Sequence, residues 1–344
     1  MKAYLDTVER VLRTGTYKPN RTAVDTISGF SEHYKIDLQE GFPLLTTKQM
    51  DGFRWTSMIH ELFWYLSGEE HIRNLRGKTG IWDEWADEDG HLDTAYGRFW
   101  RRYPVPDDAA QLPGESWIDR EDSWVTVEET KAGEERLTFD QIQYVLDQLR
   151  ENPRSRRIVV TAWHPANAGN SKLPPCHYTF VFNVQGDRLN LHLTQRSADL
   201  ALGVPFNIAC YSLLLKIVAR EVGLEAGTFS HQLVDAHVYC GTGERGEWYG
   251  ENLDELKKRL TDARSTTDGT YREVKDWLEE TAPQEAADEE GYDHVPGLLE
   301  QLSREPLERP GIEIADKPLG ELGAEDIQLR DYESHPGIRF AVAE

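Results

Sequence analysis

The chain has 344 residues and a formal net charge of −23, because 61 acidic residues stand against only 38 lysines and arginines. Nonspecific nucleic-acid binding depends on a basic surface, so this charge argues against it, although basic residues can still cluster locally. Three scattered cysteines are too few for a disulfide framework or a zinc site. With no signal peptide and no apolar run approaching membrane-spanning length, we expect a cytoplasmic protein with no membrane and no nucleic acid among its partners.

The acidic residues are spread along the chain in short runs, such as Asp83-Glu84, Asp87-Glu88-Asp89 and Asp288-Glu289-Glu290. A carboxylate-rich surface keeps a protein soluble in concentrated salt, where charge repulsion is screened. We therefore interpret the chain as a halophilic protein. The alternative is an ordinary acidic cytosolic protein.

Apolar residues at helical spacing predict helices, and alternating or continuous apolar runs predict strands. In chain order, the expected helices cover residues 2–13, 54–66, 139–150 and 208–222, and the expected strands cover residues 30–38, 158–162, 178–184, 189–194 and 228–239. Gly186 supplies the turn of a hairpin between two of these strands. Two acidic stretches, at about 101–137 and 241–297, are interpreted as insertions, the second with helical patterns at 253–260 and 271–278. We expect one α/β domain spanning residues 1–344.

The expected helix 54–66 is strongly apolar but contains Glu61 among tryptophans and leucines. A buried carboxylate is costly unless it is paired or protonated, so Glu61 is a candidate for a raised pKa. The alternative is an acid at the edge of the helix. Aromatic residues such as Trp82 and Tyr96 lie near turns, where they either pack in the core or contact a planar heterocyclic ligand.

The central segment, residues 173–211, combines a cysteine with a polar run. Cys176 follows Pro174 and Pro175, which belong to neither a helix interior nor a central strand, so the thiol is expected on a rigid loop before a strand. The second hairpin strand ends in Gln195-Arg196-Ser197-Ala198-Asp199. Its donors and acceptors suit a small anionic ligand held beside a nucleophile. Cys210, inside the expected helix 208–222, is interpreted as inert core.

Other polar residues have both a structural and a functional interpretation. Asn207 precedes the expected helix 208–222, where it is either an N-cap or a ligand-binding amide. His237 and Tyr239 share one face of a strand because they are two residues apart. Arg21 and the pair Arg156 and Arg157 are either solvated surface charges or phosphate ligands.

Four segments together resemble thymidylate synthase of the folate-dependent, cysteine-nucleophile type. In family order they are Ile81-Trp82-Asp83-Glu84-Trp85, Ser155-Arg156-Arg157-Ile158, Leu173-Pro174-Pro175-Cys176-His177 and Gln195-Arg196-Ser197-Ala198-Asp199-Leu200-Ala201-Leu202-Gly203-Val204-Pro205-Phe206-Asn207. The resemblance covers about the first hundred residues, then 139–239, then 298 to the end, and leaves out the two acidic stretches. It implies a large mixed β-sheet packed against helices and a homodimer formed through the sheet.

The implied reaction is reductive methylation of dUMP to dTMP. In it, 5,10-methylenetetrahydrofolate gives the carbon and the hydride and leaves as dihydrofolate, and no metal is needed. The residues agree with this chemistry, because C5 of uracil is a poor nucleophile until a thiolate such as that of Cys176 adds at C6. A free thiol is only a few per cent ionised at neutral pH, so a neighbouring cation should matter, and Arg196 is the candidate.

The resemblance also implies roles for individual residues. Phosphate ligands are Arg21, Arg196 and Ser197, with Arg156 and Arg157 reaching across from the second subunit. Asn207 reads the pyrimidine by donating to O4 and accepting from N3–H. The catalytic residues are Cys176, Glu61, Tyr96, His177, Arg196 and Asn207. The nucleotide-binding set is completed by Gln195, Ala198, Asp199, His237, Val238 and Tyr239, with His237 and Tyr239 at the ribose hydroxyl. The folate surfaces are Ile81, Trp82, Leu173, Asp199, Gly203, Phe206 and Ala343.

The chain departs from the family pattern at a few positions. His164 replaces the usual asparagine after the strand tryptophan, the family histidine that helps to seat folate is missing near Asp51 and Phe53, and the chain ends in Glu344 rather than in an aliphatic residue. Two rival functions remain open. One is a pyrimidine hydroxymethylase, which quenches the same intermediate with water, and the other is a noncatalytic nucleotide or RNA binder.

Overall fold

The computed structural model describes residues 1–20, 23–92, 95–105, 123–129, 133–169, 171–264, 270–286 and 290–343. Its centre is a seven-stranded sheet with the order β1-β2-β10-β8-β7-β6, and β9 pairs with β10 beside this path. The strands are β1 (Thr16–Lys18), β2 (Val24–Asp37), β6 (Val159–Thr161), β7 (His177–Gln185), β8 (Arg188–Gln195), β9 (Ala198–Asp199) and β10 (Glu225–Thr242). Since β10 runs parallel to β8 and antiparallel to β2, the sheet is mixed, as predicted.

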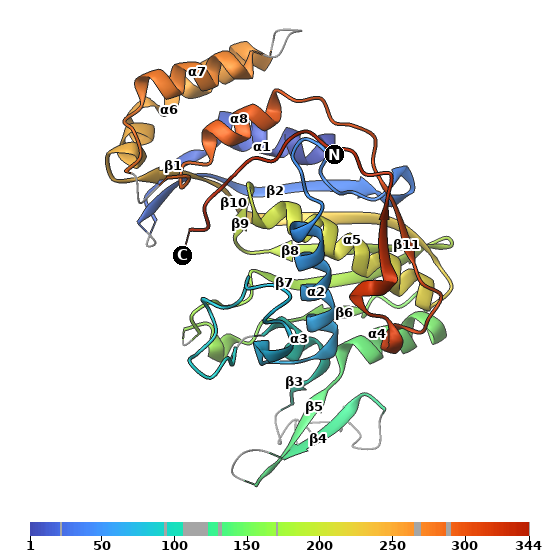
Figure 1. The fold of residues 1–344 in the computed structure, drawn as a ribbon. Coiled ribbons are helices and arrows are strands. Elements are labelled where there is room, and N and C mark those ends of the chain that lie inside the picture. Colours follow the sequence, from blue (N-terminus) through green and yellow to red (C-terminus); the bar gives the residue numbers. More distant parts are fainter. Residues whose placement is uncertain are drawn as a thin grey trace.

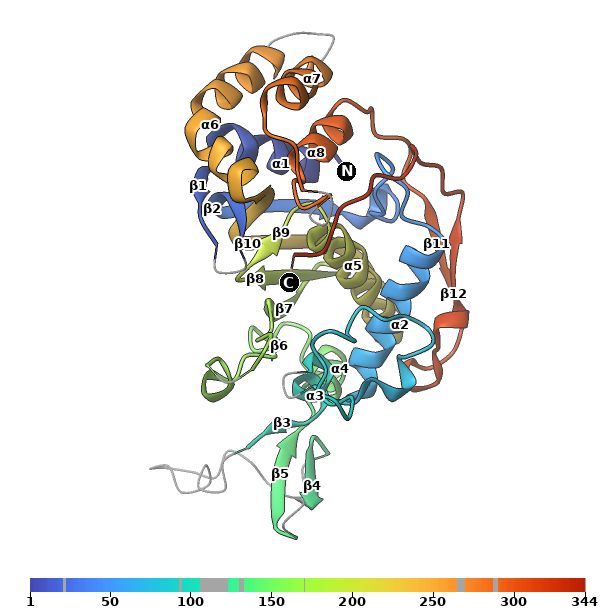
Figure 2. The same cartoon turned by 60° about the vertical axis from the view of Figure 1, so that its left-hand side comes forward.

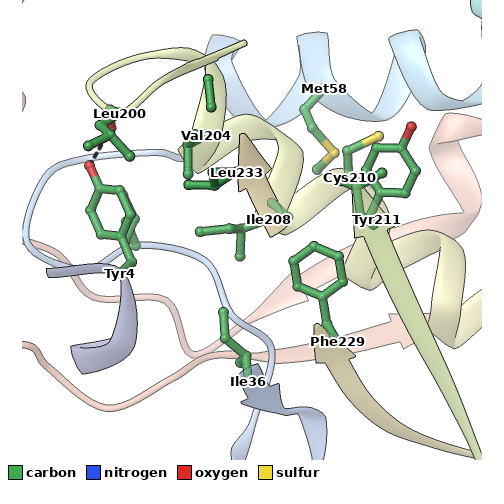
Figure 3. Packing of buried hydrophobic residues seen from close by; sticks show 14 of the residues in the cluster. Tyr4, Ile36, Met58, Leu200, Val204, Ile208, Cys210, Tyr211, Phe229 and Leu233 are labelled. Carbon is green, nitrogen blue, oxygen red and sulfur yellow. Dashed lines mark hydrogen bonds between the residues drawn. The ribbon is translucent and has the colours of Figure 1, made fainter. Parts of the chain in front are cut away.

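One face of this sheet is covered by α5 (Gly203–Glu221), the core helix (Figures 1 and 3). Ile208 and Tyr211 of α5 pack with Phe229 and Leu233 of β10 in a continuous core. By length and composition α5 would also pass as a membrane span, but 72% of its apolar window is buried inside the protein. The helix begins at Gly203, not at residue 208, because a proline is tolerated in the first turn of a helix and Pro205 does not delay it.

The other helices around the sheet include α1 (Lys2–Thr14), α2 (Phe53–Ser67), α3 (Tyr96–Arg101) and α4 (Gln141–Glu151). Helix α4 starts two residues later than predicted because Asp140 caps it, accepting from the Gln143 amide at 3.0 Å. Strand β2 starts six residues earlier than the predicted strand at residue 30. Short 3₁₀ segments lie at η1 (Leu38–Glu40), η2 (Ile72–Asn74), η4 (Pro165–Asn167), η5 (Leu319–Glu321) and η6 (Ala324–Asp326).

The stretch at 101–137 contains secondary structure that the sequence did not indicate. Strands β3 (Tyr103–Pro104), β5 (Glu135–Phe139) and β4 (Val125–Glu129) form a small antiparallel sheet that projects from the body of the molecule (Figures 1 and 2). The stretch at 241–297 is helical, as its pattern predicted. It contains α6 (Gly243–Arg264) and α7 (Tyr271–Thr281), followed by α8 (Val295–Leu302).

The C-terminal segment crosses the molecule in an extended form. Strands β11 (Gly311–Ile314) and β12 (Ile327–Arg330) pair antiparallel, and the chain then returns toward β9 (Figure 2). The amide of His335 donates to Thr46 O at 2.8 Å, and the amide of Ala341 donates to Gly291 O at 3.0 Å. The tail therefore ends beside the strands that carry the conspicuous polar residues of the sequence.

Candidate active site

A cavity of about 440 Å³ opens where β7, β8, β9 and β10 meet the start of α5. Thirteen of the predicted site residues line it, namely Tyr96, Leu173, Cys176, His177, Gln195, Arg196, Ser197, Asp199, Gly203, Asn207, His237, Tyr239 and Ala343. Sequence reasoning missed six further lining residues, which are Lys18, Asn20, Thr26, Trp85, Lys172 and Asp235. One hollow thus combines a thiol, several cations and amide groups, the set expected for an anionic, hydrogen-bonding ligand.

Cys176 lies in the loop immediately before β7, and its backbone amide donates to the Tyr96 hydroxyl at 2.7 Å. Arg196 holds this loop in place, since its Nε donates to Pro175 O at 3.0 Å and its Nη2 to Pro174 O at 2.6 Å. Burial raises the pKa of the Cys176 thiol, while the nearby Arg196 charge lowers it. The expected cation is in place, but burial outweighs it and the thiol form is favoured.

His177 and Tyr96, which both line the cavity, form a stacked aromatic pair. Their ring centroids are 3.9 Å apart with an interplanar angle of 8°, and His177 Nδ1 lies 2.6 Å from the Tyr211 hydroxyl. Burial lowers the pKa of His177 to about 3, so its imidazole is neutral at working pH. A neutral ring can pass a proton between its two nitrogens, but it is not a charged acid.

Glu61 lies on α2 and is not among the residues that line the cavity. Its Oε1 accepts from the Tyr65 hydroxyl at 2.7 Å and from Trp82 Nε1 at 2.8 Å. Burial raises the pKa of Glu61 to about 7, although both hydrogen bonds act to lower it. The predicted pKa shift is confirmed, and it places Glu61 where it can both give and take a proton near neutrality.

Asn207 lies in the second turn of α5, so the interpretation as an N-cap is wrong. Its Nδ2 donates to Gln195 Oε1 at 3.0 Å, which turns the amide toward β8. Ala198 and Val238, which were predicted to bind the nucleotide, are fully buried and do not line the cavity. Their side chains belong to the hydrophobic core.

His237 and Tyr239 lie on one face of β10, as their spacing predicted, and their rings are 5.1 Å apart. Asp235 precedes them and pairs with Lys18, and it accepts from the Ser28 hydroxyl at 2.7 Å. His237 Nδ1 lies 3.5 Å from Asp235, and this contact contributes most to holding the pKa of Asp235 well below its usual range. The Asp235 carboxylate thereby orients the His237 ring.

The predicted phosphate ligands do not all meet in one chain. Arg196 and Ser197 line the cavity, whereas Arg156 and Arg157 are exposed outside it, and Arg157 borders a separate hollow with Tyr144. Arg21 lies outside the described residues, as does Glu344.

The predicted folate surface is also only partly assembled around the cavity. Leu173, Asp199, Gly203 and Ala343 line it, whereas Ile81, Trp82 and Phe206 do not. Trp82 donates its Nε1 hydrogen to Glu61, so it positions the carboxylate, and Trp85 lines the cavity instead. Among the departures from the pattern, His164 lies near Phe99, Asp51 accepts from Gln49, and Phe53 is 69% exposed.

Asp199 anchors the turn between β9 and α5. Its carboxylate accepts from the backbone amides of Ala201 at 2.9 Å and Leu202 at 3.2 Å, and His294 Nδ1 lies 3.7 Å away. Burial acts to raise the pKa of Asp199, but His294, His237 and the Ala201 amide bring it down to about 2. The residue therefore stays a carboxylate and can accept from a ligand N–H.

Lys48 is a buried cation that sequence reasoning did not single out. It is 4% exposed, its ammonium donates to Ala201 O, and it lies 4.9 Å from the centre of the Phe340 ring in the tail. Burial lowers the pKa of Lys48 to about 7. The sequence shows only that this lysine directly follows Thr46-Thr47, and the burial of all three residues is seen only in the fold.

Comparison with known proteins agrees with this geometry. A family model for thymidylate synthase matches residues 2–344. The chain is also 65% identical over 339 residues to a protein of Haloferax volcanii named thymidylate synthase, with 98% of this chain and 96% of that protein covered. The chain therefore belongs to the thymidylate synthase family.

Proposed function

We propose that this chain methylates dUMP to dTMP in the cavity around Cys176, with 5,10-methylenetetrahydrofolate supplying the carbon and the hydride. The observation that carries the proposal is the meeting of Cys176, Arg196 and Asn207 in one cavity. The Cys176 thiolate adds to C6 of uracil, which makes C5 nucleophilic, and it leaves again when the methylated product is released. The final elimination breaks the C6–S bond and expels the sulfur as a thiolate, so the nucleophile is regenerated.

The phosphate of dUMP is proposed to bind Arg196 and Ser197. Arg196 donates from Nε and Nη2 to the carbonyls of Pro175 and Pro174. Its other N–H groups are left for phosphate oxygens. The same guanidinium therefore fixes the Cys176 loop and holds the anion. Arg21 and, from a second subunit, Arg156 and Arg157 complete the proposed phosphate site.

Asn207 is proposed to read the uracil edge, and His237 with Tyr239 to hold the ribose hydroxyl. Glu61, through water, and the Tyr96 and His177 pair are proposed to move protons at the base. The pKa of about 7 for Glu61 supports this role, since a group half-ionised near neutrality exchanges protons most readily. Asp199, which stays ionised, is proposed to accept from an N–H of the pterin.

We further propose that the active enzyme is a homodimer formed through the sheet. The face of the sheet opposite α5 bears His33, Lys35 and Val159, which are all exposed although they lie within strands β2 and β6. A second subunit that packs against this face would cover them. Arg156 and Arg157 lie just before β6 at the edge of the same sheet, where they can reach a partner's cavity.

The test is turnover of two matched cysteine variants. Cys176→Ala should abolish dihydrofolate formation while the protein still binds dUMP, because the nucleophile is lost but the phosphate and base contacts remain. Cys210→Ala removes a thiol that is fully buried in α5 and should keep turnover. Near-normal turnover by Cys176→Ala would falsify the nucleophile assignment. Consumption of dUMP without dihydrofolate absorbance would instead identify the hydroxymethylase.

A further inference from the structure

Three buried side chains form a hydrogen-bonded line behind Asn207. Tyr34 on β2, His231 on β10 and Gln195 on β8 are 5%, 0% and 3% exposed, and they come from three adjacent strands. Tyr34 and His231 are direct partners in the β2–β10 register. The Tyr34 hydroxyl lies 2.7 Å from His231 Nδ1, and His231 Nε2 lies 3.0 Å from Gln195 Oε1.

The direction of each hydrogen bond in this line, from donor to acceptor, follows from the groups at its two ends. Gln195 Nε2 donates to the carbonyl of Ser197 at 2.9 Å, so Gln195 Oε1 is the oxygen that faces Asn207 and His231. An oxygen needs donors, and therefore His231 carries its proton on Nε2 and accepts at Nδ1 from the Tyr34 hydroxyl. Asn207 in turn must present its Nδ2 to Gln195, at 3.0 Å. Its carbonyl oxygen and its second amide hydrogen are left for a ligand.

If the hydrogen bonds ran in the opposite direction, Asn207 would bind cytosine instead of uracil. If His231 carried its proton on Nδ1, the bare Nε2 would favour a reversed Gln195, and a reversed Gln195 would present its amide nitrogen to Asn207. Asn207 would then turn its oxygen inward and reverse the groups it offers to the ligand. Uracil presents a donor at N3 and an acceptor at O4, whereas cytosine presents an acceptor at N3 and a donor at N4. The direction of the hydrogen bonds thus selects between the two pyrimidines.

We propose that Tyr34 and His231 are positioning residues that fix the Asn207 amide in the orientation that accepts uracil and rejects cytosine. The inference rests on the proposed function, in which Asn207 contacts the base. Tyr34 and His231 do not line the cavity themselves, so they act through Gln195 and Asn207. Without Tyr34, the Gln195 amide is still oriented by its hydrogen bond to the Ser197 carbonyl. Removing Tyr34 therefore weakens the preference for uracil over cytosine without reversing it.

The experiment compares equilibrium binding of dUMP and dCMP to the full-length protein. The two nucleotides share phosphate and ribose, so a general loosening of the site weakens both and leaves the ratio of their dissociation constants unchanged. For Tyr34→Phe we expect the preference for dUMP to fall roughly five- to tenfold, the effect of losing about one hydrogen bond. His231→Phe, which removes the donor to Gln195, should reduce it at least as much.

Tyr249→Phe is the matched control. Tyr249 is also a buried tyrosine with one 2.7 Å hydrogen bond, to Asp293, but that carboxylate keeps its pairing with Arg245. Tyr249→Phe should leave the dUMP preference unchanged. An unchanged ratio in a folded Tyr34→Phe or His231→Phe protein overturns the proposal, as does an equal fall in Tyr249→Phe. Because binding ratios need no turnover, this test and the Cys176→Ala test can fail separately.

Discussion

Glu61 gives a prediction about stability that is independent of catalysis. Its pKa lies at about 7 in the folded protein against an ordinary 4.5, chiefly because of burial. Between these two values the folded state holds a proton that the unfolded state has lost, so raising the pH favours unfolding. Above about pH 7 the full cost of the buried carboxylate is present, and below pH 4.5 it disappears.

The size of this cost follows from the shift. The change from 4.5 to about 7 corresponds to an upper limit of about 3 to 4 kcal/mol, at about 1.4 kcal/mol per pKa unit. The residue retains some exposure, and water penetration reduces the cost, so we expect about 2 kcal/mol. Glu61→Gln removes the charge but keeps an oxygen that accepts from Tyr65 and Trp82. The variant should therefore be more stable than the wild type by about this amount at pH 8 and equally stable near pH 4.

The assay is denaturant unfolding of both proteins at several pH values in the salt that keeps the wild type folded. Turnover should be lost in the same variant, because glutamine cannot exchange the proton. Glu273→Gln, at an exposed position on α7, serves as the control and should show no pH-dependent difference. If Glu61→Gln is less stable than the wild type at pH 8, or if the difference does not vary with pH, the reasoning about burial is wrong.

Three further predictions concern charge. Arg196→Gln should raise the pKa of the Cys176 thiol and slow its alkylation at pH 7 by roughly three- to tenfold, whereas Arg196→Lys should slow it less; equal rates would exclude the electrostatic role. Mixing Cys176→Ala with an Arg156→Ala/Arg157→Ala protein should restore about a quarter of wild-type activity after subunit exchange, and no gain would argue against arginines that cross the dimer. Diluting KCl from about 3 M to about 0.1 M should lower the melting temperature, and a constant value would contradict adaptation to salt.

The meeting of Cys176 and Arg196 was predictable from the sequence, because it depends on a short hairpin. Gly186 at the turn adopts φ +67°, and the pairing it starts continues to Thr179 opposite Thr194, after which a shift in register places His177 opposite Gln195. The residues that flank this pair, Cys176 and Arg196, therefore meet, and the Arg196 amide donates to Cys176 O at 2.9 Å. Local turn chemistry therefore brings the nucleophile near a cation, and the register shift beside His177 sets the final pairing.

Contacts between distant segments could not be predicted in the same way. The pairing of Tyr34 with His231 depends on the register between β2 and β10, which no local pattern specifies. The position of Asn207 within α5 was missed because Pro205 fits equally well before or inside the first turn. Lys48 became conspicuous only when the fold buried it under Phe340 and beside Ala201.

The acidic surface and the cationic cavity make opposite demands that salt reconciles. A net charge of −23 repels a nucleotide phosphate at long range, yet Lys18, Lys172 and Arg196 line the cavity that is proposed to receive it. At molar salt the screening length falls to about 3 Å, so the distant repulsion disappears. Direct hydrogen-bonded contacts between a guanidinium and a phosphate act within that length and are partly shielded from solvent, so they persist. A halophilic enzyme of this kind can therefore carry a strongly acidic exterior without losing an anionic substrate.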